Sequence, residues 1–284
     1  MPTSSDAVRM SQSFWNSAAE TYAQAFTDTS VGKMWREAVW RELDAGFRPG
    51  ERVLELNCGT GIDAVHLAHK GIAVLGCDIS SRMVQLARQR AAAEAPESNL
   101  PDFRVVATEQ LAMLQSEAKF DGAFSNFSGL NCVQDLTAVR RDLASLLKPG
   151  ARVFLCMLGR FAPWEKLWYL AHADWKNAFR TFQSSDNVSV QDGVRVQYPS
   201  RKKIVELFTP EFTLRKWKGI GIAVPPSYME RWALRFSGIT RGLNRVDRVI
   251  GDMPILRSFG GCLLFEFERT ASTKESDGRL ENAS

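Results

Sequence analysis

The stretch Arg52-Val53-Leu54-Glu55-Leu56-Asn57-Cys58-Gly59-Thr60-Gly61-Ile62-Asp63-Ala64 decides the fold. An apolar run carrying one acid leads into a short loop with two glycines, and apolar residues at helical spacing follow. This order predicts a strand, a tight turn and a helix. Glycine is needed in such a loop where a ligand approaches the backbone too closely for a Cβ atom, or where the turn requires a positive φ.

The charges around this loop separate the possible ligands. A dinucleotide-binding loop presents a helix N-terminus to a pyrophosphate, which a nearby carboxylate would repel. Here Glu55 precedes the loop and Asp63 lies just inside the helix. The next predicted strand, residues 71–77, is followed by Asp78 at about twenty residues past the loop, where a ribose diol is commonly bound. These acids favour a nucleoside ligand that carries positive charge and no phosphate.

Two parts of the chain resemble the first two motifs of the class I S-adenosylmethionine-dependent methyltransferases that act on small molecules. They are Val53 to Gly61, and Cys77-Asp78-Ile79-Ser80-Ser81-Arg82-Met83 with Leu86-Ala87-Arg88. The resemblance covers residues 10–160 well and the remainder in outline. It implies that Glu55 and the glycine loop surround the methionine half of S-adenosylmethionine, and that Asp78 binds both ribose hydroxyls.

The same resemblance implies further contacts with the cofactor. The family usually has glycine where this chain has Asn57, a residue that tolerates left-handed backbone better than most. It commonly has an aspartate at the position of Ala107, so Thr108 and Glu109 are the expected substitutes at the adenine. The predicted cofactor-binding residues are Tyr22, which closes over the methionine end, Glu55, Asn57, Cys58, Gly59, Thr60, Gly61, Asp78, Ile79, Met83, Thr108, Glu109, Asn126 and Phe127.

Composition bounds the class of protein. The 284 residues are 45% apolar and 24% charged, which is ordinary globular usage. No run approaches the ~20 apolar residues of a membrane span, and the N-terminus lacks the regions of a signal peptide, so we expect a cytoplasmic protein. Five cysteines without CxxC spacing predict reduced thiols and no metal site. A net charge of +4 is too weak to indicate nucleic acid.

Strands that alternate with helices predict an α/β fold, a doubly wound, mostly parallel, seven-stranded Rossmann-like sheet. The predicted strands are residues 52–56, 71–77, 103–107, 120–125, 151–157, 213–220 and 261–267. The family pairs the last two antiparallel. The predicted parts of the chain are a helical cap over residues 1–47, with residues 1–8 disordered, a cofactor-binding half over 48–158, a substrate half over 159–270 and a disordered tail over 271–284.

Two inserts in the substrate half, residues 159–199 and 222–260, are expected to fold over the carboxyl edge of the sheet. The first is rich in aromatic residues, which either form a local core or wall an apolar acceptor pocket. His172 lies in it and is the candidate general base. The predicted substrate-binding residues are Trp15, Asn131, Trp164, Trp168, Tyr169 and Tyr228.

The second insert has apolar residues at helical spacing with five arginines around them. A helix that covers the acceptor site with a solvated arginine face is favoured, while peripheral contact with a membrane stays open. Arg36 and Arg41 in the cap are candidates for the cofactor carboxylate or for a solvated helix face.

The sequence therefore predicts a methyltransferase that uses S-adenosylmethionine to methylate a small, apolar or aromatic acceptor. Neither the acceptor nor the oligomeric state follows from it. A nicotinamide-dependent oxidoreductase is the first alternative, because residues 59–64 fit G-x-G-x-x-A, but Glu55 and Asp63 oppose it. A non-catalytic module that binds S-adenosylmethionine is the second. Methylation of RNA ranks low, because no Asn-Pro-Pro-Tyr motif follows the fourth predicted strand.

Overall fold

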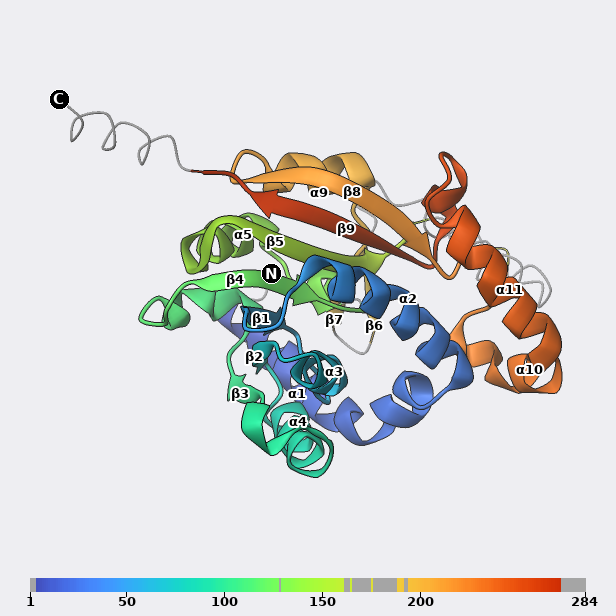
Figure 1. Cartoon of the computed structure of the whole chain (residues 1–284), viewed down its shortest axis with the longest axis horizontal. Coiled ribbons are helices and arrows are strands. Elements are labelled where there is room, and N and C mark those ends of the chain that lie inside the picture. Colours follow the sequence, from blue (N-terminus) through green and yellow to red (C-terminus); the bar gives the residue numbers. More distant parts are fainter. Residues whose placement is uncertain are drawn as a thin grey trace.

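A seven-stranded sheet with the order β3-β2-β1-β4-β5-β9-β8 forms the centre of the molecule (Figure 1). The computed structural model describes residues 4–127, 129–160, 188–191 and 194–271, together with Trp164 and Trp175. The strands are β1 Arg52–Leu56, β2 Ala73–Asp78, β3 Asp102–Val105, β4 Phe120–Ser125, β5 Leu147–Leu158, β8 Phe212–Ile220 and β9 Cys262–Arg269. The first five are parallel, and β9 is antiparallel to both β5 and β8. The predicted sheet is thereby confirmed.

Helices cover both faces of the sheet (Figure 1). Successive residues of a strand point to opposite faces, so Val53 packs with one layer of helices and Leu54 with the other. The layer that contacts Val53 consists of α2 Ser30–Gly46, α3 Ile62–His69 and α4 Ser81–Glu94. The layer that contacts Leu54 contains α5 Leu136–Leu146 and α9 Arg201–Phe208. Burial on both faces explains why the parallel strands read as continuous apolar runs.

The remaining elements surround the carboxyl edge of the sheet or connect its strands. They are α1 Ser4–Tyr22, the π-helical η1 Ala23–Thr27, the short helices η2 Glu97–Asn99, η3 Thr108–Leu114 and η4 Gly129–Cys132, the hairpin β6 Val188–Gln191 and β7 Val194–Gln197, and then η5 Ser227–Met229, α10 Glu230–Arg235, α11 Ser237–Ile250 and η6 Leu256–Phe259. Because α1 already begins at Ser4, the prediction of disorder over residues 1–8 is wrong from Ser4 onward. The β6–β7 hairpin was not predicted.

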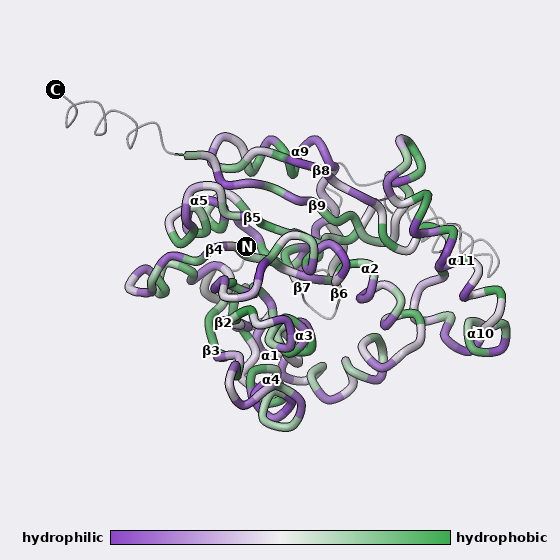
Figure 2. Tube along the Cα trace, viewed as in Figure 1, coloured by the Kyte–Doolittle hydropathy of each residue, from purple (hydrophilic) through white to green (hydrophobic). Residues whose placement is uncertain are grey.

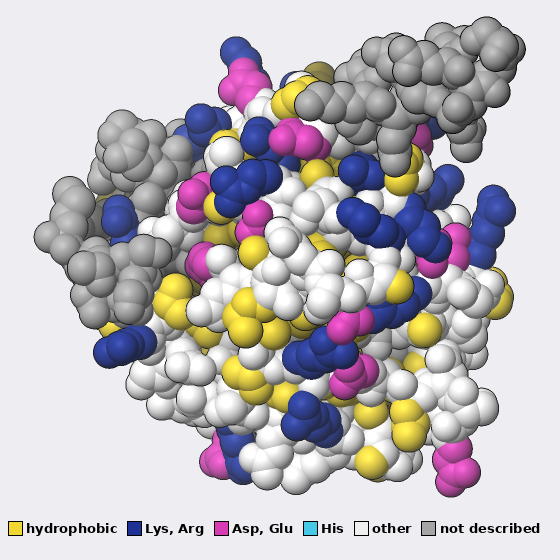
Figure 3. Space-filling model, turned by 90° about the vertical axis from the view of Figure 1, so that its left-hand side faces the viewer, with side chains coloured by type: hydrophobic (Ala, Val, Ile, Leu, Met, Phe, Trp, Pro, Cys, Tyr) yellow, Lys and Arg dark blue, Asp and Glu magenta, His cyan; other side chains and the backbone are white. Residues whose placement is uncertain are grey.

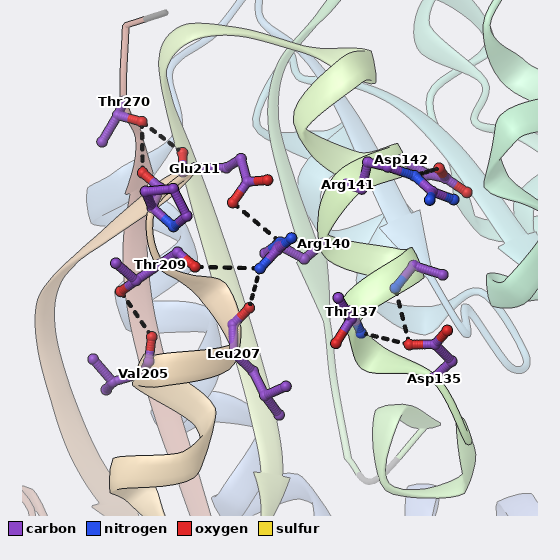
Figure 4. Close-up of polar contacts among 12 residues, drawn as sticks. Asp135, Thr137, Arg140, Arg141, Asp142, Val205, Leu207, Thr209, Glu211 and Thr270 are labelled. Atoms are coloured by element: carbon purple, nitrogen blue, oxygen red, sulfur yellow. Dashed lines mark hydrogen bonds and ion pairs between the residues drawn. The ribbon is translucent and has the colours of Figure 1, made fainter.

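Arg140 on α5 ties that helix to the connection between α9 and β8. Its Nη1 donates to the carbonyl oxygens of Leu207 at 3.1 Å and Thr209 at 3.2 Å, and its Nε lies 3.1 Å from the carboxylate of Glu211 (Figure 4). At the start of α5, the Asp135 side chain accepts hydrogen bonds from the first turn, which satisfies backbone donors that have no partner within the helix. These contacts hold α5 beside the connection between α9 and β8.

Candidate functional site

The loop after β1 has a left-handed backbone at three positions. Asn57, Gly59 and Gly61 have φ values of 56°, 52° and 74°, so asparagine does occupy a position that suits it. Its amide Nδ2 donates to Thr108 Oγ1 at 2.9 Å and its Oδ1 accepts from Ser125 Oγ at 3.1 Å. The Asn57 side chain therefore ties the loop to residues that follow β3 and end β4.

Asp78 at the end of β2 lies directly beside this loop. Its carboxylate accepts hydrogen bonds from the backbone N–H of Gly59 at 2.9 Å and of Ser80 at 2.8 Å. Burial raises the pKa of Asp78, and the backbone hydrogen bonds partly oppose that rise. The carboxylate thus joins the glycine loop to the N-terminus of α4, where Ser80 also caps the helix by accepting from Met83 N.

Glu55 on β1 is 1% exposed, and its Oε2 has no hydrogen-bond partner in the part of the chain that the structure describes. Burial first, and the nearby Asp63 second, raise the pKa of Glu55 well above its usual value. A buried acceptor without a partner costs free energy. A cationic ligand at this edge of the sheet would relieve that cost.

Glu55→Gln should therefore stabilise the ligand-free protein at neutral and alkaline pH. A raised pKa means that the folded state holds the Glu55 proton more tightly than the unfolded chain, so this group destabilises the fold progressively as pH rises above the unfolded value of about 4.5. The variant cannot lose this proton. Melting temperatures of the two proteins should converge near pH 5 and separate toward about pH 8, and a constant difference would contradict the burial of an ionisable Glu55.

Asp63 at the start of α3 belongs to a buried ion pair. Its Oδ2 lies 2.6 Å from Nη1 of Arg36 and accepts from Asn126 Nδ2 at 3.0 Å, while its Oδ1 accepts from Trp40 Nε1 at 2.6 Å. Arg36 also lies over the ring of Phe127, with its Cζ 4.9 Å from the ring centroid. Arg36 is thus not a solvated residue, and Asp63 is not a free acid. The acids left to favour a cation are Asp78 and, once a cationic ligand lowers its raised pKa, Glu55.

A cleft opens above the loop, at the carboxyl edge of the parallel strands. Helix α1 bounds it, because Gln12 Nε2 donates to Ile79 O at 3.0 Å and Asn16 Oδ1 accepts from Ser80 Oγ at 2.7 Å. The residues that line the cleft are Ser11, Trp15, Tyr22, Asn57, Gly59, Asp78, Ile79, Met83, Thr108, Glu109, Asn126, Phe127, Gly129 and Cys132. Ten of them are among the fourteen predicted cofactor-binding residues. Acids beside apolar Ile79 and Met83 fit a nucleoside that bears positive charge.

A second cavity of about 400 Å³ adjoins this cleft. Its lining is mostly aromatic and apolar: Tyr22, Ala25, Phe26, Trp35, Phe127, Leu158, Trp164, Gly221, Pro226, Ser227, Tyr228, Gly261 and Cys262. Tyr22 and Phe127 line both spaces. Burial raises the pKa of Tyr22 to about 12, so its hydroxyl stays protonated near neutral pH.

The structure separates the remaining predicted residues. Trp164 and Tyr228 line the second cavity, whereas Trp15 lines the cleft. Asn131 lines neither: it is fully buried, donates to Gln197 O at 2.6 Å and accepts from Leu158 N at 2.9 Å. Four of the predicted cofactor-binding residues also line neither space. They lie on β1 or directly after it and are Glu55, Cys58, Thr60 and Gly61. His172, Trp168 and Tyr169 lie outside the described residues.

Several residues of the second cavity were not predicted. Phe26 and Trp35 precede the sheet, and Leu158 and Cys262 end or begin its central strands. Trp35 packs where a Cβ atom on Gly221 would lie 2.1 Å from its Cζ2 and one on Gly261 would lie 2.4 Å from its Cη2. These two glycines, which lie between β8 and β9, could have indicated the packing of Trp35, because glycine often marks a close approach of another group to the backbone.

Residues 53–150 match a family model described as a methyltransferase domain. Among curated proteins, the demethylmenaquinone methyltransferase of Corynebacterium kroppenstedtii is 34% identical over 126 residues, 44% of this chain and 49% of the relative. The ubiquinone biosynthesis O-methyltransferase of Xanthomonas axonopodis pv. citri is 37% identical over 111 residues, 39% of this chain and 44% of the relative. The chain thus spans about half the length of the curated relatives it matches.

Solved structures show the same fold over a longer stretch. Magnesium protoporphyrin IX methyltransferase from Synechocystis PCC 6803, with bound SAH, covers 93% of this chain and 100% of its own, at a TM-score of 0.57 and 18% identity. The domain match, the strand order and the cleft at the carboxyl edge agree with one another. The chain therefore carries a methyltransferase domain, and its fold is that of the class I methyltransferases.

Proposed function

We propose that the protein transfers the methyl group of S-adenosylmethionine to a small lipophilic acceptor that is phenolic or quinone-like. The observation that carries the proposal is the contact between the two spaces at Tyr22 and Phe127. One space has carboxylates for a cationic nucleoside, and the other has an aromatic lining for a planar apolar molecule. Their shared wall is where a methyl group would pass from one to the other.

In this proposal the cofactor lies in the cleft along the glycine loop. Asp78 accepts hydrogen bonds from the ribose hydroxyls, and Glu55, on β1 beneath the loop, compensates the charge of the ammonium group. Ile79 and Met83 flank the adenine, and Thr108 and Glu109 bind its edge. Asn126 and Phe127, held through the pair of Arg36 and Asp63, form the floor beside the reacting group.

The bound cofactor supplies a methyl group that its sulfonium has already activated. The protein then has to align the acceptor and exclude water, which the aromatic lining favours. An acceptor oxygen or carbon gives an electron pair to the methyl carbon, the sulfur keeps the pair of the bond that breaks, and the acceptor loses a proton. Protonated Tyr22 can donate a hydrogen bond but does not take this proton. His172 remains the proposed base.

The names of the relatives support an acceptor of this class. Two of them are named for demethylmenaquinone and for ubiquinone biosynthesis, and both names refer to lipophilic quinones. A cavity of about 400 Å³ has the size of small-molecule sites. Its walls are mostly aromatic and apolar and, among the residues that the structure describes, carry no basic side chain, which does not suit a nucleic-acid strand.

Two measurements test the proposal. Calorimetry should detect binding of S-adenosylmethionine and S-adenosylhomocysteine and no binding of NAD. With labelled S-adenosylmethionine, label should enter a demethylmenaquinone or a polyprenylated phenol and should not enter RNA. Binding without transfer to any lipophilic acceptor would favour the non-catalytic module, and binding of NAD alone would refute the proposal.

Ser227→Trp should reduce acceptor binding selectively. Ser227 lies on η5 at the wall of the second cavity and does not line the cofactor cleft. A large side chain there would occupy space that the acceptor needs, so KM for the acceptor should rise by about tenfold or more. Ser227→Ala, which keeps the space open, is the matched control. An equal loss of cofactor affinity in Ser227→Trp would mean that the two spaces are not separate sites.

A further inference from the structure

Large apolar side chains are concentrated on the surface of α10, α11 and the turn that follows. Of the fifteen such side chains that are most exposed among the described residues, nine lie within residues 230–259. They are Leu234, Phe236, Ile239, Val246, Val249, Met253, Ile255, Leu256 and Phe259. Both helices lie at one end of the molecule, away from the sheet (Figure 1), and α11 alternates between hydrophilic and hydrophobic colours (Figure 2). We call residues 230–259 the α10–η6 surface.

The side of α11 that faces the protein carries Thr240, Leu243 and Asp247, and Leu243 packs against the core, while other apolar residues of the helix lie outside. Thr240 is buried and donates to Ala233 O at 3.0 Å, and Asp247, two turns later, accepts from the backbone N–H groups of residues 222–224. Ile239 and Val249 are 55% and 59% exposed, and with Val246 they share one side of the helix. A helix in water normally buries such a side, and within the part of the chain that the structure describes these three side chains stay exposed.

The charges of this surface are of one sign. Its three acids are used within the protein: Glu230 accepts from Ser30 N and Val31 N, Asp247 from residues 222–224, and Asp252 pairs with Lys218. Five exposed arginines make no ion pair with any described residue: Arg231, Arg235, Arg241, Arg245 and Arg248. Figure 3 shows that basic and acidic side chains are interspersed on another face of the molecule.

We propose that the α10–η6 surface docks the protein on an anionic lipid bilayer, with α11 parallel to the membrane plane. Exposed apolar residues beside unpaired arginines are the composition of an interfacial helix: the apolar face enters the boundary between headgroups and acyl chains, and the arginines bind lipid phosphates. Arginine side chains are long enough to extend to the headgroups from the edges of such a face. The three acids of this surface all make contacts within the protein, so they leave the arginines available to lipid phosphates.

The surface is continuous with the wall of the second cavity. Tyr228, which lines that cavity, is 53% exposed and lies on η5, directly before α10. A lipophilic molecule dissolved in the bilayer would therefore meet the cavity at the docked surface. The delivery of a lipophilic acceptor from the bilayer rests on the proposed function, whereas docking on the bilayer does not.

The test is cosedimentation of the full chain with vesicles, which needs no activity. The protein should bind phosphatidylcholine vesicles that contain phosphatidylglycerol, should bind pure phosphatidylcholine vesicles far more weakly, and should be released as salt increases. Arg241→Glu/Arg245→Glu should lower the partition coefficient by about 25-fold or more, because each arginine near an anionic surface contributes roughly fivefold. Lys202→Glu/Lys203→Glu on α9, two exposed residues outside this surface, changes the net charge by the same amount and is the matched control, which should change little.

A second variant tests the apolar face. Ile239→Ser/Val249→Ser should lose vesicle binding with little change in melting temperature, because more than half of each residue is already exposed. Met113→Ser, at another highly exposed apolar residue, is its control. Absence of vesicle binding by the wild type, or equal binding to neutral and anionic vesicles, would overturn the proposal. So would a dimer in solution that Ile239→Ser/Val249→Ser dissociates, since the surface would then be an interface between copies of this chain.

Discussion

Replacing Arg36 by methionine should lower the free energy of unfolding by about 3–5 kcal/mol, the usual cost of removing one partner of a buried ion pair. Arg36 is 4% exposed and its guanidinium lies 2.6 Å from Asp63. Methionine would fill much of the volume but leave the Asp63 carboxylate buried with only the neutral donors Trp40 and Asn126. Chemical denaturation at neutral pH measures this loss.

Two comparisons make the Arg36 result specific. Arg82→Met removes an exposed pair with Glu20 at 2.8 Å and should cost less than about 1 kcal/mol. Arg36→Met/Asp63→Asn removes both charges and should recover part of the loss, because no buried charge is left alone. If the double variant is less stable than Arg36→Met by the full cost of a second independent mutation, the pair is not coupled as described.

Asp78→Ala should weaken binding of S-adenosylmethionine by about tenfold to a hundredfold or more. A hydrogen bond to a charged group contributes roughly 1.5–3 kcal/mol, and the ribose offers two hydroxyls. The same carboxylate holds Gly59 N and Ser80 N, so alanine would also loosen the glycine loop. Calorimetric titration with S-adenosylmethionine measures the change in Kd.

The control for Asp78 is Asp102→Ala, which removes an exposed acid at the edge strand β3. It changes the net charge by the same amount and should leave Kd unaltered. A Kd for Asp78→Ala equal to that of the wild type would show that this carboxylate does not bind the ribose. An equal loss of affinity in Asp78→Ala and Asp102→Ala would mean that both acids act on the cofactor only through long-range charge.

The glycine loop and the cleft beside it could be predicted because their determinants are local. The turn after β1 needs residues that accept positive φ, and such residues are visible in sequence as Asn57, Gly59 and Gly61. Asp78 could be placed because parallel strands bring their carboxyl ends to one edge. The spacing of these residues along the chain was therefore enough to predict where they lie. The pairing of Asp63 with Arg36 could not be predicted, because it depends on how α2 packs against α3.

The second cavity was predicted less completely, because its lining residues meet only through tertiary packing. Phe26 and Trp35 come from before the sheet, while Gly221 and Cys262 come from its last two strands and their connection. No local pattern connects them. Asn131 was predicted to bind the substrate, because an asparagine in a loop after a strand is often available to a ligand. Its side chain instead makes hydrogen bonds with the backbone of β5 and β7. Burial of this kind is not visible in composition.

The lining of the second cavity has a consequence for how such an enzyme diversifies. Phe127 is the one lining residue that falls within residues 53–150, and the others come from either side of that stretch. Under the proposed function, mutations in η1, α2 and η5 can therefore change the acceptor while the sequence motifs of residues 53–150 stay unchanged. A mutant library confined to Ala25, Phe26, Ser227 and Tyr228 should yield variants with altered acceptor range at little cost to folding, which makes this wall the natural starting point for engineering new methylation chemistry.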